Sequence, residues 1–368
     1  MYPEDKLAAI AYGDDVTLTD RDLASILNGY EEMDEALFMA SSIVLDRTLG
    51  RDTYLHGIVQ ITNECQRNCY YCGLRRSNDS QPRFSLPFGE VMNSLTRGYN
   101  AGVRSFMLQS GELLDERTVS LVEHLLLEVE KKWGDKVAMA LSIGEHPLSD
   151  LERFKSKGAS RYLLRIESSD RELYMKLHPR DSIHRYSSRL DCLVNLHGSG
   201  WETGTGVLVG VPWQNDAHLA GDLRFMQRLD VDVCNMNPYA VHDGTPFAKE
   251  RRLIPPAEER LLKYLRMIGL MRILMPDINI PISARLLSVH HSGPMRALKA
   301  GANAYMANLT PAKYRRNYDL YGGKPAETNS IEVVVNDAIR LCENVGRPVK
   351  LLDPGVSRHY RKRMEEKE

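Results

Sequence analysis

The sequence predicts a complete (βα)8 barrel of the TIM type, an α/β fold, preceded by a helical extension. After about residue 50, short apolar or β-branched runs alternate with longer amphipathic stretches, which gives about eight βα units. The chain has 368 residues, which suits one large barrel, and no break in composition divides it into two domains. Polar or Gly/Pro-containing segments follow nearly every predicted strand, where barrel proteins carry their working groups.

The helical extension is predicted over residues 1–50. Thr19 can cap a helix over residues 20–28, with Asp22 completing a pair that resembles a capping box. A second stretch, Glu31–Leu49, carries apolar residues at helical spacing.

The barrel is predicted over residues 51–350 and a charged C-terminal tail over 351–368, of which residues 358–368 are expected to fray. The predicted strands are 57–62, 105–109, 137–143, 161–166, 204–209, 233–236, 280–284 and 304–308. The predicted helices between them are 87–101, 116–132, 149–157, 186–198, 216–229, 256–274 and 293–300.

The composition argues against several classes of partner. Lys and Arg number 48 and Asp and Glu 49, so the charge gives no case for binding nucleic acid or a membrane surface. No apolar run approaches the roughly 18 residues that span a bilayer, and the first residues lack the pattern of a signal peptide. These features favour the cytoplasm, where reducing conditions keep thiols available for metal.

Three of the six cysteines, Cys65, Cys69 and Cys72, form the motif C-x3-C-x2-C after the first predicted strand. Three thiolates in one loop can hold a 4Fe–4S cluster and leave one iron without a protein ligand. One alternative is zinc with His56 as fourth ligand, although structural zinc usually uses two separated ligand pairs. Three inert buried thiols are another alternative. The remaining cysteines are predicted to be core residues: Cys192, Cys234 and Cys342.

With Tyr71 before the third cysteine, the motif reads C-x3-C-x-aromatic-C and resembles the signature of the radical SAM superfamily. The resemblance implies a 4Fe–4S cluster whose open iron is chelated by S-adenosylmethionine (SAM). It also implies that one electron splits SAM, and that the resulting 5′-deoxyadenosyl radical acts on a small substrate inside the barrel. No side chain is predicted as catalytic, because the cluster-bound SAM is the radical source.

Further segments narrow the resemblance. They are Cys72-Gly-Leu-Arg-Arg76, Leu108-Gln-Ser-Gly-Glu112, Leu141-Ser-Ile-Gly-Glu145, Arg161-Tyr-Leu-Leu-Arg165, Asn308-Leu-Thr-Pro311 and Tyr318-Asp-Leu-Tyr321. Together they resemble the HydE group of FeFe-hydrogenase maturases, whose relatives include methylornithine synthase (PylB) and, further off, biotin synthase. The similarity runs from about residue 20 to about residue 350.

By this resemblance the SAM-binding residues are Tyr71, Ser110, Glu112, Arg165, Glu167, Arg189 and Leu208. The segment with Ser110 and Glu112 would contact the methionine amino group. Arg165 and Glu167 would hold the carboxylate and ribose, Arg189 would be a second partner of the carboxylate, and Leu208 would flank the adenine. These roles are chemically sensible, because a guanidinium fork suits a carboxylate.

The resemblance also implies that Tyr318 and Tyr321 line an internal substrate cavity, with Ser283, Arg285 and His56 as further candidates. Two positions depart from the HydE pattern. His56 stands where an arginine is usual, and Ile166 stands where a histidine is expected. No cysteine occurs in residues 322–332, where many members carry a second cluster, so one cluster is predicted.

Three hypotheses about function follow. The leading one is a radical SAM enzyme of the HydE type, acting by resemblance on a cysteine-bound iron complex with CO and cyanide ligands. Its implied partners are a reductant such as a flavodoxin or ferredoxin, and other hydrogenase maturases. The second is an amino-acid mutase of the methylornithine-synthase kind, and the third is a non-enzymatic metal-binding protein.

Overall fold

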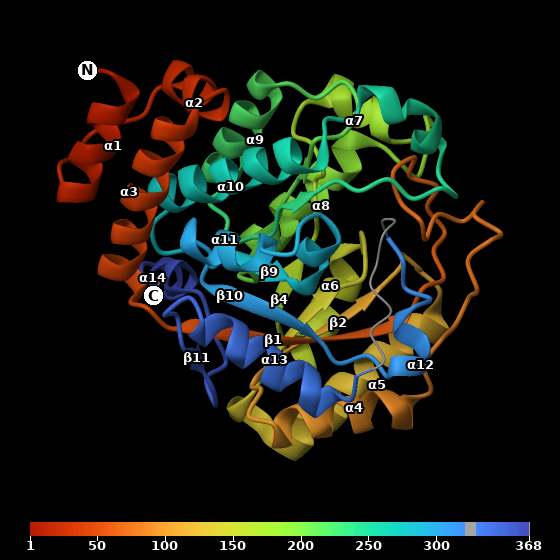
Figure 1. Ribbon diagram of the computed structural model, residues 1–368. Coiled ribbons are helices and arrows are strands. Elements are labelled where there is room, and N and C mark those ends of the chain that lie inside the picture. Colours follow the sequence, from red (N-terminus) through yellow and green to blue (C-terminus); the bar gives the residue numbers. More distant parts are fainter. Residues whose placement is uncertain (321–328, 368) are drawn as a thin grey trace.

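The computed structural model describes residues 1–320 and 329–367, and its centre is a nearly closed barrel of eight parallel strands (Figure 1). The barrel strands are β1 (Thr53–Thr62), β2 (Ser105–Ser110), β3 (Ala138–Ser142), β4 (Ala159–Leu163), β5 (Glu202–Thr205), β7 (Val233–Cys234), β9 (Pro281–Ser283) and β10 (Ala304–Asn308). They pair in the order β7-β5-β4-β3-β2-β1-β10-β9, and a parallel bridge between Val233 and Asn279 joins the two edges. The predicted barrel is therefore confirmed.

In the described part of the chain, three short strands lie outside this ring. They are β6 (Leu208–Val209), β8 (Asn237–Pro238) and β11 (Val349–Lys350). The strands β6 and β8 continue β5 and β7 after short breaks and pair with each other, whereas β11 pairs with the beginning of β1.

Helices alternate with the strands and cover the outside of the barrel (Figure 1). The α-helices are α1 (Pro3–Tyr12), α2 (Asp20–Leu27), α3 (Glu31–Leu49), α4 (Phe88–Asn100), α5 (Glu116–Trp133), α6 (Leu148–Ser156), α7 (Arg171–Leu177), α8 (Tyr186–Gly198), α9 (Asp216–Arg228), α10 (Ala257–Leu274), α11 (Gly293–Lys299), α12 (Ala312–Arg315), α13 (Ile331–Glu343) and α14 (Arg358–Glu365). The 3-10 helices of the described residues are η1 (Gly134–Lys136), η2 (Pro246–Leu253) and η3 (Ala284–Ser288). Among the described residues, no helix combines the length and apolar character needed to cross a bilayer.

The N-terminal helices pack against the side of the barrel and form the predicted extension. The backbone N–H of Asp22 donates to the Thr19 hydroxyl at 3.2 Å, and the Thr19 N–H donates to the Asp22 carboxylate at 2.6 Å, which completes the capping box. A buried ion pair between Arg266 of α10 and Asp34 of α3, at 2.6 Å, then joins the extension to a barrel helix.

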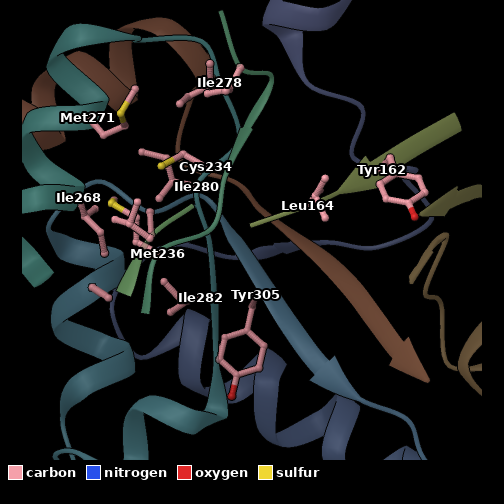
Figure 2. Close-up of a cluster of buried hydrophobic side chains, with 14 of the residues drawn as sticks. Tyr162, Leu164, Cys234, Met236, Ile268, Met271, Ile278, Ile280, Ile282 and Tyr305 are labelled. Carbon is pink, nitrogen blue, oxygen red and sulfur yellow. The ribbon is translucent and has the colours of Figure 1, made fainter. Parts of the chain in front are cut away.

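Between the barrel wall and its helices lies one continuous apolar core. Figure 2 shows Ile268 and Met271 of α10 facing Cys234 and Met236 of the wall. The Cys234 thiol lies 3.4 Å from the sulfur of a methionine in α9. Cys192 and Cys342 are buried as well, as expected of core residues, and the three cysteines are free thiols.

Side chains inside the barrel form layers, because every second residue of a strand points inward. His56, Ile58 and Gln60 follow one another along the inward face of β1. Ile58 belongs to an apolar layer with Met107, Ala140, Leu163 and Met306. Gln60 lies above it, where its amide donates to the Gln109 side chain at 3.3 Å.

Below the apolar layer, polar groups fill the base of the barrel. The His56 ring lies 2.5 Å from the Ser105 hydroxyl, and Arg161 pairs with Glu202 at 2.9 Å. The backbone carbonyl of Gly355 accepts hydrogen bonds from Arg161 and from Asn279. The segment that follows β11 therefore closes the base of the barrel.

The prediction that residues 358–368 fray is wrong for most of that segment, because residues 358–365 form α14. Arg363 of this helix pairs with the fully buried Asp232 at 2.6 Å. His359 lies between Asp277, at 2.9 Å, and Asp230, at 2.8 Å. The charges that suggested a solvated tail are ion-pair partners of the barrel base.

These contacts predict a pH-dependent docking of α14. Burial alone would lower the pKa of His359, but its hydrogen bonds to Asp277 and Asp230 raise that pKa to about 9. A raised histidine pKa contributes stability that is fully present below about pH 6.5 and is lost as the pH rises through about 9. We expect His359→Gln to remove about 1–2 kcal/mol from the opening free energy of α14 at pH 6, after allowance for solvent screening.

Hydrogen–deuterium exchange of α14 at pH 6 and pH 9.5 measures this effect. The wild-type helix should lose protection between the two values, once intrinsic exchange rates are corrected, while the variant should change little. An equal loss of protection in both proteins would contradict the assignment of the switch to His359.

Candidate functional site

The cysteine loop leaves the C-terminal end of β1 and lies over that end of the barrel. The Sγ atom of Cys65 accepts backbone N–H groups of Arg67, at 3.4 Å, and Glu112, at 3.3 Å. Burial raises the pKa of all three loop thiols, that of Cys72 to about 12. Bound metal would compensate the charge of the three thiolates, which burial alone disfavours.

The loop packs tightly against the end of β2. A Cβ atom on Gly111 would lie 2.2 Å from the carbonyl oxygen of Glu64 and 2.7 Å from the Cβ of Cys65. The backbone N–H of Gly111 also donates to the Thr62 carbonyl at 3.2 Å. Only glycine permits this approach, which fixes the first cysteine relative to the strand ends.

Four charged side chains, which we call the ion quartet, join the cysteine loop to the barrel: Arg67, Glu112, Glu145 and Arg189. Glu112 ends the segment after β2, Glu145 follows β3, and Arg189 lies on α8. Arg67 pairs with Glu112 and lies 3.2 Å from Glu145, and Arg189 lies 2.8 Å from Glu145 and 3.6 Å from Glu112. These side chains are only 5–11% exposed. Although burial opposes its charge, the carboxylates of Glu145 and Glu112 hold the pKa of Arg189 well above its usual value.

A second ionic pair follows β4. Arg165 and Glu167 pair at 2.7 Å, and burial raises the pKa of Glu167 although Arg165 opposes that shift. The backbone φ of Glu167 is 65°, in the left-handed region that non-glycine residues adopt at a cost of roughly 1 kcal/mol. Such strain is concentrated at functional sites.

Tyr71 packs against a histidine that the sequence analysis did not single out. Its ring meets the His178 ring edge-on with centroids 5.4 Å apart, and its hydroxyl lies 3.4 Å from the His178 Nε2. The His178 Nδ1 lies 2.8 Å from the Tyr174 carbonyl, and burial lowers the pKa of His178 to about 3. The imidazole is therefore neutral, so Nδ1 donates and Nε2 accepts.

A cavity of about 150 Å³ opens among these groups at the C-terminal end of the barrel. It brings together ten of the sequence-predicted site residues: Cys65, Cys69, Tyr71, Cys72, Ser110, Glu112, Arg165, Glu167, Arg189 and Tyr318. Its other lining residues include Arg67, Gln109, Ser142, Gly144, Leu163 and Leu320.

Other predicted residues lie outside this lining. Leu208 is fully buried behind it, in an apolar cluster that also contains Cys69 and Tyr71. The Ser283 hydroxyl accepts the N–H of Arg285, whose guanidinium donates to the Tyr318 carbonyl at 3.2 Å. Tyr321 lies outside the described residues.

His56 lies at the opposite end of β1, in the polar base. It precedes Thr62, the last residue of β1, by six positions, which corresponds to about 20 Å along a strand. The apolar layer with Ile58 lies between them. This position removes His56 as a ligand of a zinc ion that the cysteines would hold, and it places His56 apart from the cavity.

The donor set fits a cluster, because three cysteines of one loop line the same cavity. Among the described residues, no three His, Cys, Asp or Glu side chains converge as ligands of one metal ion would. A 4Fe–4S cluster needs wider spacing, because each thiolate binds a different iron. One loop carrying Cys65, Cys69 and Cys72, with backbone N–H groups directed at a sulfur, meets that requirement.

Arg67 and Glu145 are members of the site that the sequence analysis did not assign. The signal for Glu145 was present, because Ser142-Ile-Gly-Glu145 follows β3 much as Ser110-Gly-Glu112 follows β2. Arg67 had no comparable signal, since its partners are distant in the sequence.

Comparisons with known proteins agree with this geometry. A family model described as the radical SAM superfamily matches residues 59–226. The [FeFe] hydrogenase maturase subunit HydE of Thermotoga maritima is 34% identical over 313 residues, which cover 85% of this chain and 86% of the relative. The 3-methylornithine synthase of Methanosarcina barkeri is 27% identical and covers 86% of this chain and 93% of its own. The crystal structure of the maturase HydG from Carboxydothermus hydrogenoformans has a TM-score of 0.79 at 18% identity, over 98% of this chain and 81% of its own.

The close approach at Gly111 predicts a sensitive position. We expect Gly111→Ala to displace the beginning of the cysteine loop and to lower anaerobic iron and sulfide incorporation at least threefold. Gly89→Ala is the matched control, because a Cβ there meets nothing within 4 Å. Iron and sulfide analysis after identical reconstitution measures both variants, and full loading of Gly111→Ala would show that the loop tolerates displacement.

Proposed function

This chain belongs to the radical SAM superfamily, and from that premise we propose that it is a maturase of the HydE type, acting in assembly of the FeFe-hydrogenase active site. The observation that carries the proposal is the cysteine loop held by Gly111 against the ion quartet, at the mouth of a complete barrel. Identity of 34% to HydE over most of both chains supports the finer assignment.

The cofactors are a 4Fe–4S cluster and SAM. When bound, the reduced cluster supplies the electron that cleaves SAM to methionine and a 5′-deoxyadenosyl radical. The chain contributes the three thiolates that hold the cluster, and its ionic groups bind and orient the charged part of SAM.

We assign the ends of SAM by charge. The amino-acid part of SAM carries an ammonium and a carboxylate, and the ion quartet presents both signs of charge in a buried place. Glu112 would accept the ammonium, while Arg189 would pair with the carboxylate as Glu145 holds its other side. Arg165 and Glu167 would hold the carboxylate and ribose, and Tyr71 and Leu208 would flank the adenine.

The substrate would lie deeper in the barrel. The polar layer with Gln60 and Gln109 faces the cavity, while the apolar layer with Ile58 closes it from below. A small molecule or small iron complex at this level would be shielded from water, which protects a reactive intermediate. Tyr318, Arg285, Ser283 and Tyr321 are the proposed neighbours of the substrate.

The proposed setting is the cytoplasm, with a low-potential reductant and other hydrogenase maturases as partners. A second candidate function is an amino-acid mutase. The match to 3-methylornithine synthase, which covers 93% of that enzyme, supports this second candidate. The compound 3-methylornithine is an isomer of lysine. Incubating the reduced protein with SAM and lysine, with mass spectrometry for an isomer, distinguishes this candidate from the maturase.

The cluster assignment predicts the behaviour of Cys69→Ala. We expect wild-type protein, reconstituted under anaerobic conditions, to bind about four irons and to form methionine and 5′-deoxyadenosine with dithionite. The variant should lose cluster and cleavage together, because two thiolates do not hold the remaining irons. Cys234→Ala, a core thiol far from the loop, controls for general effects of removing a cysteine. Purified protein that holds zinc, or a variant with unchanged iron, would falsify the assignment.

Glu112→Gln separates binding of SAM from binding of the cluster. The variant keeps its size and loses the charge that would meet the ammonium, so the Kd for SAM should rise about tenfold or more. Its iron content should match wild type. Equilibrium binding of SAM to the reconstituted protein measures this, and an unchanged Kd would remove Glu112 from the SAM site.

A further inference from the structure

The outer face of the cysteine loop is hydrogen-bonded to His184, one of the residues that line a surface groove. The backbone N–H of Asn68 donates to the Nε2 of His184 at 2.9 Å, and the N–H of Tyr70 donates to the Leu177 carbonyl at 2.9 Å. Cys69 lies between these two residues and is 8% exposed. The groove is therefore separated from a cluster ligand by one hydrogen bond and one peptide unit.

The groove lies between α7 and α8 and has a volume of about 590 Å³. Its apolar lining includes Met175, Pro179 and Leu190. Arg171, Arg180 and Arg185 also line it, and all three are exposed. An apolar floor with arginines at the rim is the composition of a protein-binding surface, where arginine is enriched.

The groove carries a small excess of positive charge although the whole chain is almost neutral. Its lining holds Arg171, Arg180 and Arg185 against Asp181 and Asp191, whereas the whole chain has a formal net charge of −1. Among the described residues, the side chains of Arg76, Arg171 and Arg180 make no hydrogen bond or ion pair. These exposed charges are therefore available to a partner.

A partner bound in the groove would not block the cavity, whereas a partner bound at the barrel mouth would. A protein that docked over the cavity would cover the entry of SAM and substrate. A protein that docked in the groove would reach the cluster through the loop from outside and leave the cavity accessible.

We propose that this groove is the docking surface of a small acidic ferredoxin that reduces the cluster. The inference rests on the proposed function, since it assumes that a cluster occupies the cysteine loop. The transfer moves one electron: the ferredoxin is oxidised by one electron, the cluster is reduced by one, and no atom changes place. The path runs from the groove through His184 and Asn68 to Cys69. The exposed arginines attract the acidic carrier and raise its rate of association, an effect that salt weakens.

The double variant Arg171→Glu/Arg180→Glu tests the surface, because neither side chain has a contact whose loss would disturb the fold. Formation of 5′-deoxyadenosine is measured with reduced ferredoxin over a range of concentrations, and separately with dithionite. We expect the KM for ferredoxin at 50 mM salt to rise at least tenfold in the variant, with the dithionite-driven rate within twofold of wild type. Raising the salt to 300 mM should weaken the wild-type response to ferredoxin and change that of the variant little.

Lys131→Glu/Lys136→Glu is the matched control. These exposed lysines lie at the end of α5 and in η1, near the base of the barrel, so the same change in net charge is placed far from the groove. Its KM for ferredoxin should stay within twofold of wild type. An unchanged KM in the Arg171/Arg180 variant, or an equal rise in the control, would overturn the proposal.

Binding of oxidised ferredoxin, measured by calorimetry, tests the docking surface separately from the proposed enzymatic function. Wild-type protein that binds ferredoxin, with binding lost in the Arg171/Arg180 variant, supports the surface even if no SAM is cleaved. Absence of 5′-deoxyadenosine with both reductants would count against the proposed function alone. Wild-type protein that cleaves SAM with dithionite but binds no ferredoxin would overturn the docking surface alone.

Discussion

The candidate site depends on the ion quartet, two positive and two negative side chains held together in a buried place. Removing four charges from water is costly, and an apolar packing of the same space is often as stable or more stable. The quartet is therefore poor at stabilising the fold, but it is well suited to receive a ligand that carries both signs of charge. Its partners are already oriented before the ligand arrives, which is the condition under which electrostatic interactions are most effective. It also connects the cysteine loop to two strand ends and α8.

Much of the fold could be predicted because its local signals agree. All eight barrel strands were expected from short buried runs such as Ser105–Ser110, and the helix beginning at Asp20 was expected from its capping box. The break between β5 and β6 was not expected, because the run 204–209 is uniformly apolar or small. The helix in the C-terminal segment was not predicted, for a different reason. The charges of α14 look solvent-exposed in the sequence, and only their distant partners Asp232 and Asp277 turn them into packing groups.

Some residues of the candidate site could also be predicted from the sequence, and others could not. The cysteines and most of the ionic residues were visible from sequence motifs, and the structure gathers ten of the predicted site residues around one cavity. Arg67 and His178 were not visible, because their roles exist only through residues on other elements. His56 was a candidate for the cavity because it stands where the HydE pattern usually has an arginine, but a layer of apolar side chains in the barrel interior separates it from the site. The position of a residue along its strand determines whether its side chain points into the barrel. The side chains of the neighbouring strands determine which layer of the interior it belongs to.

The closure of the barrel base by Gly355 and α14 has a consequence for truncation of the chain. All eight barrel strands precede residue 310, whereas the groups that cover Arg161 and Glu202 follow residue 350. The residues that form the ring of strands are therefore complete in the sequence before the residues that close its base. A chain cut at residue 350 would keep every barrel strand but would leave the Arg161–Glu202 pair open to water at the base.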